Sequence, residues 1–272
     1  LSVLDGEVCA AGWCIEHPRL GALGWRAVEL LDSGEGFAAS DRGDVLRWNG
    51  TAWSQIREGD GVAINGIWAA DSRHVYFAGR QGLLLKFDGA TFHTLTTGTS
   101  VELTAVDGDA AGAWVVGANG QILRVVDPQV TSWPSGTSAN LADVWVAPDG
   151  TAWAVGGATV VRFNGTGWAS ATAPTVSSTY PLRFEAVHGS SPTDVVIGGT
   201  FNFRWNGTSW TELTPRLEED LFDLKRTAAG AVGVGTHGAV ALWDGASWAL
   251  LPTDGFRELL RSVAILRDQL VA

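Results

Sequence analysis

The 272-residue sequence predicts an all-β fold built from seven similar units, and three observations support this prediction. A motif of the form Asn/Asp-Gly-x-x-aromatic recurs along the chain, and its Asn or Asp markers are spaced by 37 to 44 residues. Short runs rich in β-branched and aromatic residues lie between turn-forming residues, and no stretch has the period of an amphipathic helix. Glycine is abundant, with 35 residues, as expected of a chain with many tight turns.

Each repeat has the same internal order of four predicted strands. The first strands have β-branched centres, as in "INGIWA", "LTAVDG" and "FEAVHG". A loop of Asp, Ser, Gly and Pro leads to a second strand that ends in small residues, such as "VYFAG" or "AWAVG". A Gly-containing turn precedes the third strand, and the Asn/Asp-Gly turn then opens the fourth. Four strands per unit of about 40 residues indicate the blade of a β-propeller.

The two ends of the chain decide the predicted number of blades. Six complete units run from about residue 23 to about residue 252. The tail "FRELLRSVAILRDQLVA" supplies only first and second strands, and the head "LSVLDGEVCAAGWCIEHP" only third and fourth strands. We therefore expect residues 1–272 to form one domain, a seven-bladed propeller of four-stranded antiparallel blades. The N- and C-terminal strands would close the seventh blade (Velcro), through a tight or interrupted join because this repeat is the shortest.

The segment "IWAADSRHVYFAGRQGLLLKFDGATF" and its copies resemble the Trp-rich propeller repeats of many secreted and surface-attached bacterial proteins. The resemblance covers nearly the whole chain, including the "GWC" of the head. It implies the propeller fold but hardly restricts the function, since such propellers serve as lectins, partner platforms, assembly factors and occasionally enzymes.

Composition excludes several classes of partner. The net charge of −11 argues against nucleic acid, which requires a basic surface, and against anionic lipid. No apolar run approaches the roughly 20 residues of a membrane helix. No motif indicates a cofactor or a metal, and we expect the domain to be monomeric.

The cysteines bear on the compartment. Cys9 and Cys14 are the only two, and five residues apart they are poor zinc ligands without two further ligands nearby. We interpret them as a local disulfide across a hairpin, which favours an oxidising compartment. With no Met in the chain, a removed signal peptide would fit, as would a cloned fragment. A secreted, periplasmic or cell-surface location is expected.

The aromatic residues of the repeat are interpreted as packing between blades. Trp48 and Trp53 flank the turn of "RWNGTAW" and recur in nearly every unit. Asn49-Gly50-Thr51 is formally an N-glycosylation acceptor, yet sister repeats carry Asp88 and Asp244 at the place of Asn49. The position therefore selects for a turn with positive φ, and the acceptor sequence is a by-product.

Candidate site residues are those at which the repeat departs from its own rule. One such position directly follows the buried Val, Ile or Leu of each first strand, and in the resembled repeats it is usually Trp. First strands line the channel of a propeller. Six candidates occupy this position, namely Glu29, Trp68, Asp107, Trp145, His188 and Lys225. They could hold a polar ligand between two Trp walls, or simply be solvated and paired with one another. His188 lacks an HxH partner, so metal ligation is not expected.

Two further sets of candidates depart from the repeat. Asp143 and Asp223 occupy a column that is otherwise small and could be channel-lining carboxylates. The turns between second and third strands form a ring on one face, where the candidates are Arg42, Arg80, Asn119 and His237. Polar turn residues are exposed by default, so this ring also has a purely structural explanation.

Three functions remain open at this point. The leading one is a non-catalytic, extracytoplasmic module that binds a protein or glycan partner through the channel mouth or the blade loops, because no motif of a known catalytic site is present. The second is a carbohydrate-active enzyme, a glycosidase or lyase, which would bring at least two Asp, Glu or His side chains into one pocket with perturbed pKa values. The third is a structural repeat domain of a larger surface protein.

Overall fold

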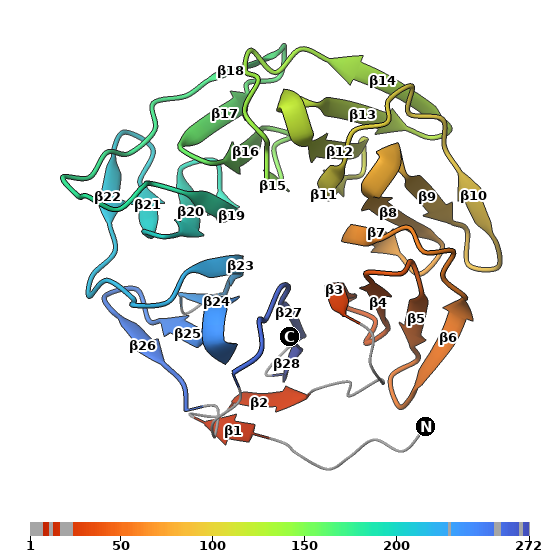
Figure 1. Ribbon diagram of the computed structural model, residues 1–272, viewed down its shortest axis with the longest axis horizontal. Helices are drawn as coiled ribbons and strands as arrows, with labels where there is room; N and C mark the ends of the chain where they lie inside the picture. The colour runs from red at the N-terminus through yellow and green to blue at the C-terminus, as the bar shows by residue number, and fades with distance from the viewer. Residues whose placement is uncertain are drawn as a thin grey trace.

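Six consecutive segments of the chain each fold into a four-stranded antiparallel sheet, and the six sheets surround a central channel (Figure 1). The computed structural model describes residues 8–10, 13–16, 24–227, 230–252, 257–266 and 269–271. Within each sheet the strands follow one another in chain order, from the innermost to the outermost. The predicted order of four strands per repeat is confirmed.

The innermost strands line the channel and are β3 (Trp25–Leu30), β7 (Ile64–Asp71), β11 (Leu103–Asp109), β15 (Asp143–Val146), β19 (Phe184–Ser191) and β23 (Leu221–Arg226). The second strands are β4 (Gly36–Ser40), β8 (His74–Gly79), β12 (Gly112–Gly117), β16 (Ala152–Gly156), β20 (Asp194–Gly199) and β24 (Ala231–Gly235). These second strands are almost completely buried. They are rich in Ala, Val and Gly because a neighbouring blade covers each of their faces.

The third strands are β5 (Val45–Trp48), β9 (Leu84–Phe87), β13 (Ile122–Val126), β17 (Thr159–Phe163), β21 (Phe203–Trp205) and β25 (Val240–Trp243). The outermost strands are β6 (Trp53–Arg57), β10 (Phe92–Thr94), β14 (Gln129–Trp133), β18 (Trp168–Ser170), β22 (Trp210–Glu212) and β26 (Trp248–Leu250). One-turn 3-10 helices join second and third strands in three blades, at η1 (Arg80–Gly82), η2 (Ala118–Gly120) and η3 (Thr236–Gly238).

The hairpin between third and fourth strands has the predicted geometry. Gly50 adopts a positive φ of 95°. The Asn49 Oδ1 accepts hydrogen bonds from the Thr51 N–H at 2.9 Å, the Thr51 hydroxyl at 2.8 Å and the Ala52 N–H at 2.9 Å. Asp88 and Asp244 accept the same backbone N–H groups in their turns. The position is therefore defined by the turn, as the sequence indicates.

The aromatic columns pack within and between blades, as predicted. Trp48 lies directly opposite Trp53 across the hairpin, with ring centroids 5.6 Å apart. A second-strand aromatic of one blade then packs on the aromatic pair of the next, as Trp153 does on Trp205 at 5.9 Å and on Trp210 at 5.8 Å. These contacts join blades along the outer part of the ring.

The prediction of seven antiparallel blades, the seventh closed as Velcro by the terminal strands, is wrong. The described residues form six antiparallel blades, and the strands near the chain ends form a different sheet in the order β1-β2-β28-β27. These strands are β1 (Val8–Ala10), β2 (Trp13–Glu16), β27 (Ala264–Leu266) and β28 (Gln269–Val271). β2 runs parallel to β28, with Ile15 opposite Leu270, whereas the predicted blade needs an antiparallel third strand.

The difference has a physical cause. Within a repeat, a short turn forces the next strand to run antiparallel. No turn joins the head of the chain to its tail, so the direction of the head strands is set by packing alone. Trp13–Glu16 consequently takes the place beside β28, and Val8–Ala10 lies outside it.

Candidate functional site

The inner strands place four successive positions beside the channel, which we call positions A to D. Position A holds Ala27, Gly66, Ala105, Asp143, Ala186, Asp223 and Ser262, and position B holds the buried Val, Ile or Leu that follows. Position C holds Glu29, Trp68, Asp107, Trp145, His188, Lys225 and Ala264. Position D holds the next residue, for example Gly108 and Val146. Because side chains alternate along a strand, positions A and C of one blade face positions B and D of the next.

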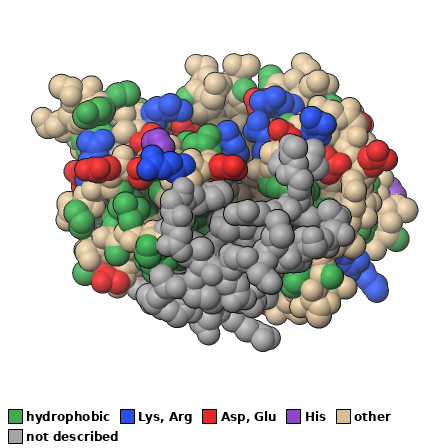
Figure 2. Space-filling model, turned by 60° about the horizontal axis from the view of Figure 1, so that its bottom comes forward, with side chains coloured by type: hydrophobic (Ala, Val, Ile, Leu, Met, Phe, Trp, Pro, Cys, Tyr) green, Lys and Arg blue, Asp and Glu red, His purple; other side chains and the backbone are tan. Residues whose placement is uncertain are grey.

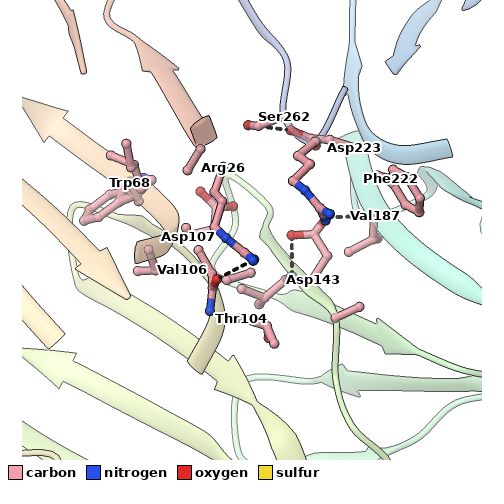
Figure 3. Close-up of a pocket in the computed structure, with 18 of the residues that line it drawn as sticks. Arg26, Trp68, Thr104, Val106, Asp107, Asp143, Val187, Phe222, Asp223 and Ser262 are labelled. Carbon is pink, nitrogen blue, oxygen red and sulfur yellow. Dashed lines mark hydrogen bonds between the residues drawn. The ribbon is translucent and has the colours of Figure 1, made fainter. Parts of the chain in front are cut away.

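A cavity of about 260 Å³ lies at the channel, where the inner strands converge (Figure 3). All eight channel candidates from the sequence line it, namely Glu29, Trp68, Asp107, Asp143, Trp145, His188, Asp223 and Lys225. Figure 3 shows Trp68, Asp107, Asp143 and Asp223 arranged around the space from different blades. The structure thus brings together the residues at which the repeat departs from its rule.

The two Trp residues at position C are explained by the glycines they face. A Cβ on Gly189 would lie 2.5 Å from the Trp145 indole, and a Cβ on Gly108 would lie 2.9 Å from that of Trp68. Each indole therefore packs directly on the backbone of the next blade. These rings form cavity walls, but their position is fixed by contact between blades.

Opposite Val146 and Arg226 at position D, position C carries a hydrogen-bond acceptor that is smaller than Trp. Asp107 Oδ2 accepts the Val146 N–H at 2.6 Å, and His188 Nδ1 accepts the Arg226 N–H at 3.2 Å. An accepting Nδ1 places the neutral imidazole proton on Nε2. Burial, followed by the charges of Lys225 and Arg226, lowers the pKa of His188 well below its usual value, in agreement with a neutral ring.

Asp143 and Asp223 join neighbouring blades in the same way from position A. Asp143 Oδ2 accepts the Val187 N–H at 2.8 Å. Asp223 Oδ2 accepts the Val263 N–H at 2.8 Å and the Ser262 hydroxyl at 2.9 Å. The other oxygen of each carboxyl accepts the N–H of the following residue in its own strand. These carboxyls thus connect each inner strand to the next one.

Glu29 and Lys225 are the two ionisable position C residues that this packing does not use. Among the residues that the structure describes, neither side chain has a hydrogen-bond or ion-pair partner, although both line the cavity. Both are half-buried. Glu29 and Lys225 therefore keep free polar atoms at the channel.

The cavity has a marked electrostatic imbalance. Burial raises the pKa of Glu29 to about 7 against the opposing charge of Lys225, and burial raises the pKa of Asp107 to about 6. Burial and the charge of Asp223 raise the pKa of Asp143 to about 7, and burial also raises the pKa of Asp223. Burial would lower the pKa of Lys225, but the four carboxylates, Glu29 first, raise it above its usual value. Four carboxyls thus act on one ammonium, and the guanidinium groups of Arg26 and Arg261 also line the cavity.

A polar network at the rim of the cavity was missed by sequence reasoning. Arg26 donates to Asn65 Oδ1 at 3.1 Å, and Asn65 Nδ2 donates to Glu102 Oε1 at 3.0 Å. Glu102 also pairs with Arg80 at 3.1 Å, so three blades are connected. Arg26 and Asn65 stand directly before position A, and an alignment of that column would have found them. The view of Figure 2 shows acidic and basic side chains mixed over its upper part.

The four candidates from the second-to-third-strand turns do not line the channel cavity. Arg80 belongs to the rim network, and His237 Nδ1 lies 2.7 Å from Glu219 Oε2. The Asn119 N–H donates to Asn140 Oδ1 at 2.9 Å, and Arg42 donates its N–H to Ser40 Oγ at 3.2 Å. Asn119 and His237 have positive φ values of 58° and 52°. These residues shape turns and bridge neighbouring loops.

Three other expectations concern metals, membranes and the cysteines. In the described ranges, no three His, Cys, Asp or Glu side chains group as metal ligands, and no helix is long and apolar enough to cross a membrane. The backbone pairs Cys9 opposite Cys14 in the β1–β2 hairpin. Their side chains lie outside the described residues, so the disulfide stays a prediction.

Comparison with known proteins supports the β-propeller fold. No protein-family model and no curated protein matches the sequence. The structure is similar to "YCF48 bound to D1 peptide", with a TM-score of 0.72, 14% identity, and coverage of 92% of this chain and 87% of that chain. It is similar to the WD40 β-propeller domain of Doa1, with a TM-score of 0.74, 12% identity, and coverage of 90% and 87%. It also resembles a catalytically inactive virginiamycin B lyase from Staphylococcus aureus with quinupristin, with a TM-score of 0.74, 11% identity, and coverage of 96% and 93%. At these identities the likeness shows the fold alone, and the Trp-rich bacterial family itself stays a resemblance.

Proposed function

We propose that this chain is a non-catalytic binding module that takes a segment of a partner protein at its central channel. The observation that carries the proposal is the contrast at position C. Asp107, His188 and the two Trp residues are engaged with the next blade, while Glu29 and Lys225 face the cavity with free polar atoms. A similar propeller has been studied with a bound peptide, which supports this choice of ligand.

A glycan partner is less favoured by the same geometry. Sugars bind proteins by stacking on exposed aromatic faces, and the channel indoles of Trp68 and Trp145 pack on glycine backbone. Their exposed fractions are only 9% and 5%. A peptide with a polar side chain uses Glu29 and Lys225 instead.

To test the proposal, displayed peptides are selected for binding to the folded chain. The selected peptides are then tested for binding to a variant in which the opening of the channel is narrower. Ala142 lines the cavity directly before position A, where other inner strands carry Arg26 or Phe222, so Ala142→Phe fits the column and reduces the opening. Asp244→Asn is the matched control, because Asn occupies this turn in sister blades and Asp244 is exposed. Selected peptides should bind Ala142→Phe at least tenfold more weakly and Asp244→Asn unchanged. Failure to select any peptide, or equal binding to a folded Ala142→Phe, would refute the proposal.

An enzyme is the second candidate, because four carboxyls with raised pKa values converge at one cavity as that hypothesis requires. Glu29 would be the general acid, since it alone of these four carboxyls has no hydrogen-bond partner among the described residues. Hydrolysis or elimination of a panel of polysaccharides, lost in Glu29→Gln, would support this candidate. If the protein is inactive on the whole panel of polysaccharides, the enzyme hypothesis is rejected and the binding module remains the proposed function.

The module is also proposed to act outside the cytoplasm. The backbone register of Cys9 with Cys14 supports this, because it places two cysteines where a cross-strand disulfide forms. Thiol titration of the protein purified from its native compartment tests it. Two free thiols there would contradict an oxidising location.

A further inference from the structure

We infer that the channel receives a lysine side chain of the partner, with its ammonium group beside the Glu29 carboxylate. This inference rests on the proposed function and names the chemistry of its ligand. It is carried by three features of the cavity: its charge, its one free carboxyl and its shape.

The charge of the cavity favours a cation. Six carboxyl groups line it, whereas its basic side chains are three, namely Lys225, Arg26 and Arg261. Lys225 forms no ion pair with any carboxylate in the described part of the chain, although four of these carboxylates act on it at longer range. An added anion would meet this excess of carboxyls, whereas an added cation reduces their mutual repulsion.

Glu29 is the carboxyl that is free to bind this cation. The acceptor oxygens of Asp143 and Asp223 hold backbone N–H groups of two strands each, and Asp107 holds that of Val146. Turning those carboxyls toward a ligand would leave buried N–H groups unpaired, which is costly. Glu29 has no such commitment among the described residues, so it can accept hydrogen bonds from an ammonium without that cost.

The cavity is polar around this group and apolar along its walls. Val28, Val106 and Val187 line it between the charged residues and can contact the methylenes of a long side chain. Its volume of about 260 Å³ exceeds that of several water molecules, each of roughly 30 Å³. The ammonium of lysine is a compact point charge that can approach Glu29 between the other side chains of the cavity, whereas the guanidinium of Arg is a larger planar fork.

The probe is the blocked peptide acetyl-Gly-Lys-Gly-amide, compared by calorimetry with the same peptide carrying norleucine, which has a similar chain without the charge. The lysine peptide should bind at least tenfold more tightly at pH 7.5 and low ionic strength. Glu29→Gln should lose at least tenfold of this affinity. Lys225→Met should increase the affinity, because it removes the competing resident cation. Asp244→Asn, an exposed carboxyl far from the channel, should leave it unchanged.

Acidic pH provides a second readout on the unmodified protein. Protonation of the channel carboxyls at pH 5 should weaken binding of the lysine peptide but not of the norleucine peptide. This comparison tests the inference even if thermal unfolding shows that Lys225→Met does not fold.

Several results would overturn the inference: equal binding of both peptides, no effect of Glu29→Gln, or loss of binding in a folded Lys225→Met. If displayed peptides bind at the opening of the channel without containing lysine, the inference fails and the proposed function stands. If no displayed peptide binds at all, the proposed function fails first.

Discussion

The Trp145 indole packs on Gly189 of the next blade so closely that a Cβ on Gly189 would lie 2.5 Å from two ring carbons. The same relation joins Trp68 to Gly108, at 2.9 Å. Trp at position C thus accompanies Gly at position D of the following blade. At Asp107 and His188, position C instead accepts a hydrogen bond from the backbone N–H of the position D residue. That residue is Val146 for Asp107 and Arg226 for His188.

This relation predicts that Gly189→Ala destabilises the protein. Overpacking of this kind costs about 1–3 kcal/mol, and here the backbone oxygen of Asp194 lies 2.9 Å from the added carbon as well. Trp145→Ala in the same chain should recover part of the loss, so denaturant unfolding of both single variants and the double variant should show coupling. Strictly additive effects would mean that the indole does not cause the strain.

The carboxyl of Asp143 should stabilise the contact between the fourth and fifth blades. Asp143→Ala leaves the Val187 N–H without its acceptor, at a cost of about 1–3 kcal/mol. Asp143→Asn keeps an acceptor oxygen and should lose less. Urea unfolding compares the two variants, and a larger loss in Asp143→Asn would contradict this role.

Stability should fall as pH rises from about 4.5 to about 7 through the contribution of Glu29. Its pKa is raised by burial from 4.5 to about 7, so the folded state keeps a proton that the unfolded chain releases in this window. The stabilisation is fully present below the unfolded pKa and is lost as pH passes the folded pKa. The lowered pKa of His188 changes stability with pH in the opposite direction. Because His188 is present in both wild type and Glu29→Gln, comparing the two proteins isolates the contribution of Glu29.

Glu29→Gln should therefore have a smaller decrease in unfolding free energy between pH 5 and pH 7.5 than wild type. Denaturant unfolding at the two pH values measures this difference, with Asp244→Asn as the charge-matched control. Identical pH dependence of Glu29→Gln and wild type would show that Glu29 does not titrate in this range.

The turns predict which substitutions the blades tolerate. Asn49→Asp should change stability by less than about 0.5 kcal/mol, because Asp88 makes the same backbone hydrogen bonds in its own turn. Asn49→Ala removes the acceptor of three hydrogen bonds and should cost about 1 kcal/mol. Thermal unfolding of the pair distinguishes them, and equal melting temperatures would count against this interpretation of the turn.

The repeat made most of the fold predictable. Short turns such as Asn49-Gly50 determine which strand follows and in which direction, and the aromatic residues around them pair across the same hairpin. The direction of Trp13–Glu16 could not be predicted, because no turn connects it to Gln269–Val271 and only packing selects the parallel register.

By itself, the sequence determined the four-stranded repeat, the turns and the set of residues that meet at the channel, because these depend on local periodicity. Only the tertiary structure decided which of those residues are free. At four of the position C residues, the residue at position D of the next blade, about 40 residues along the chain, determines whether position C packs or hydrogen-bonds. That contact engages Trp68, Asp107, Trp145 and His188, and it leaves Glu29 and Lys225 facing the cavity.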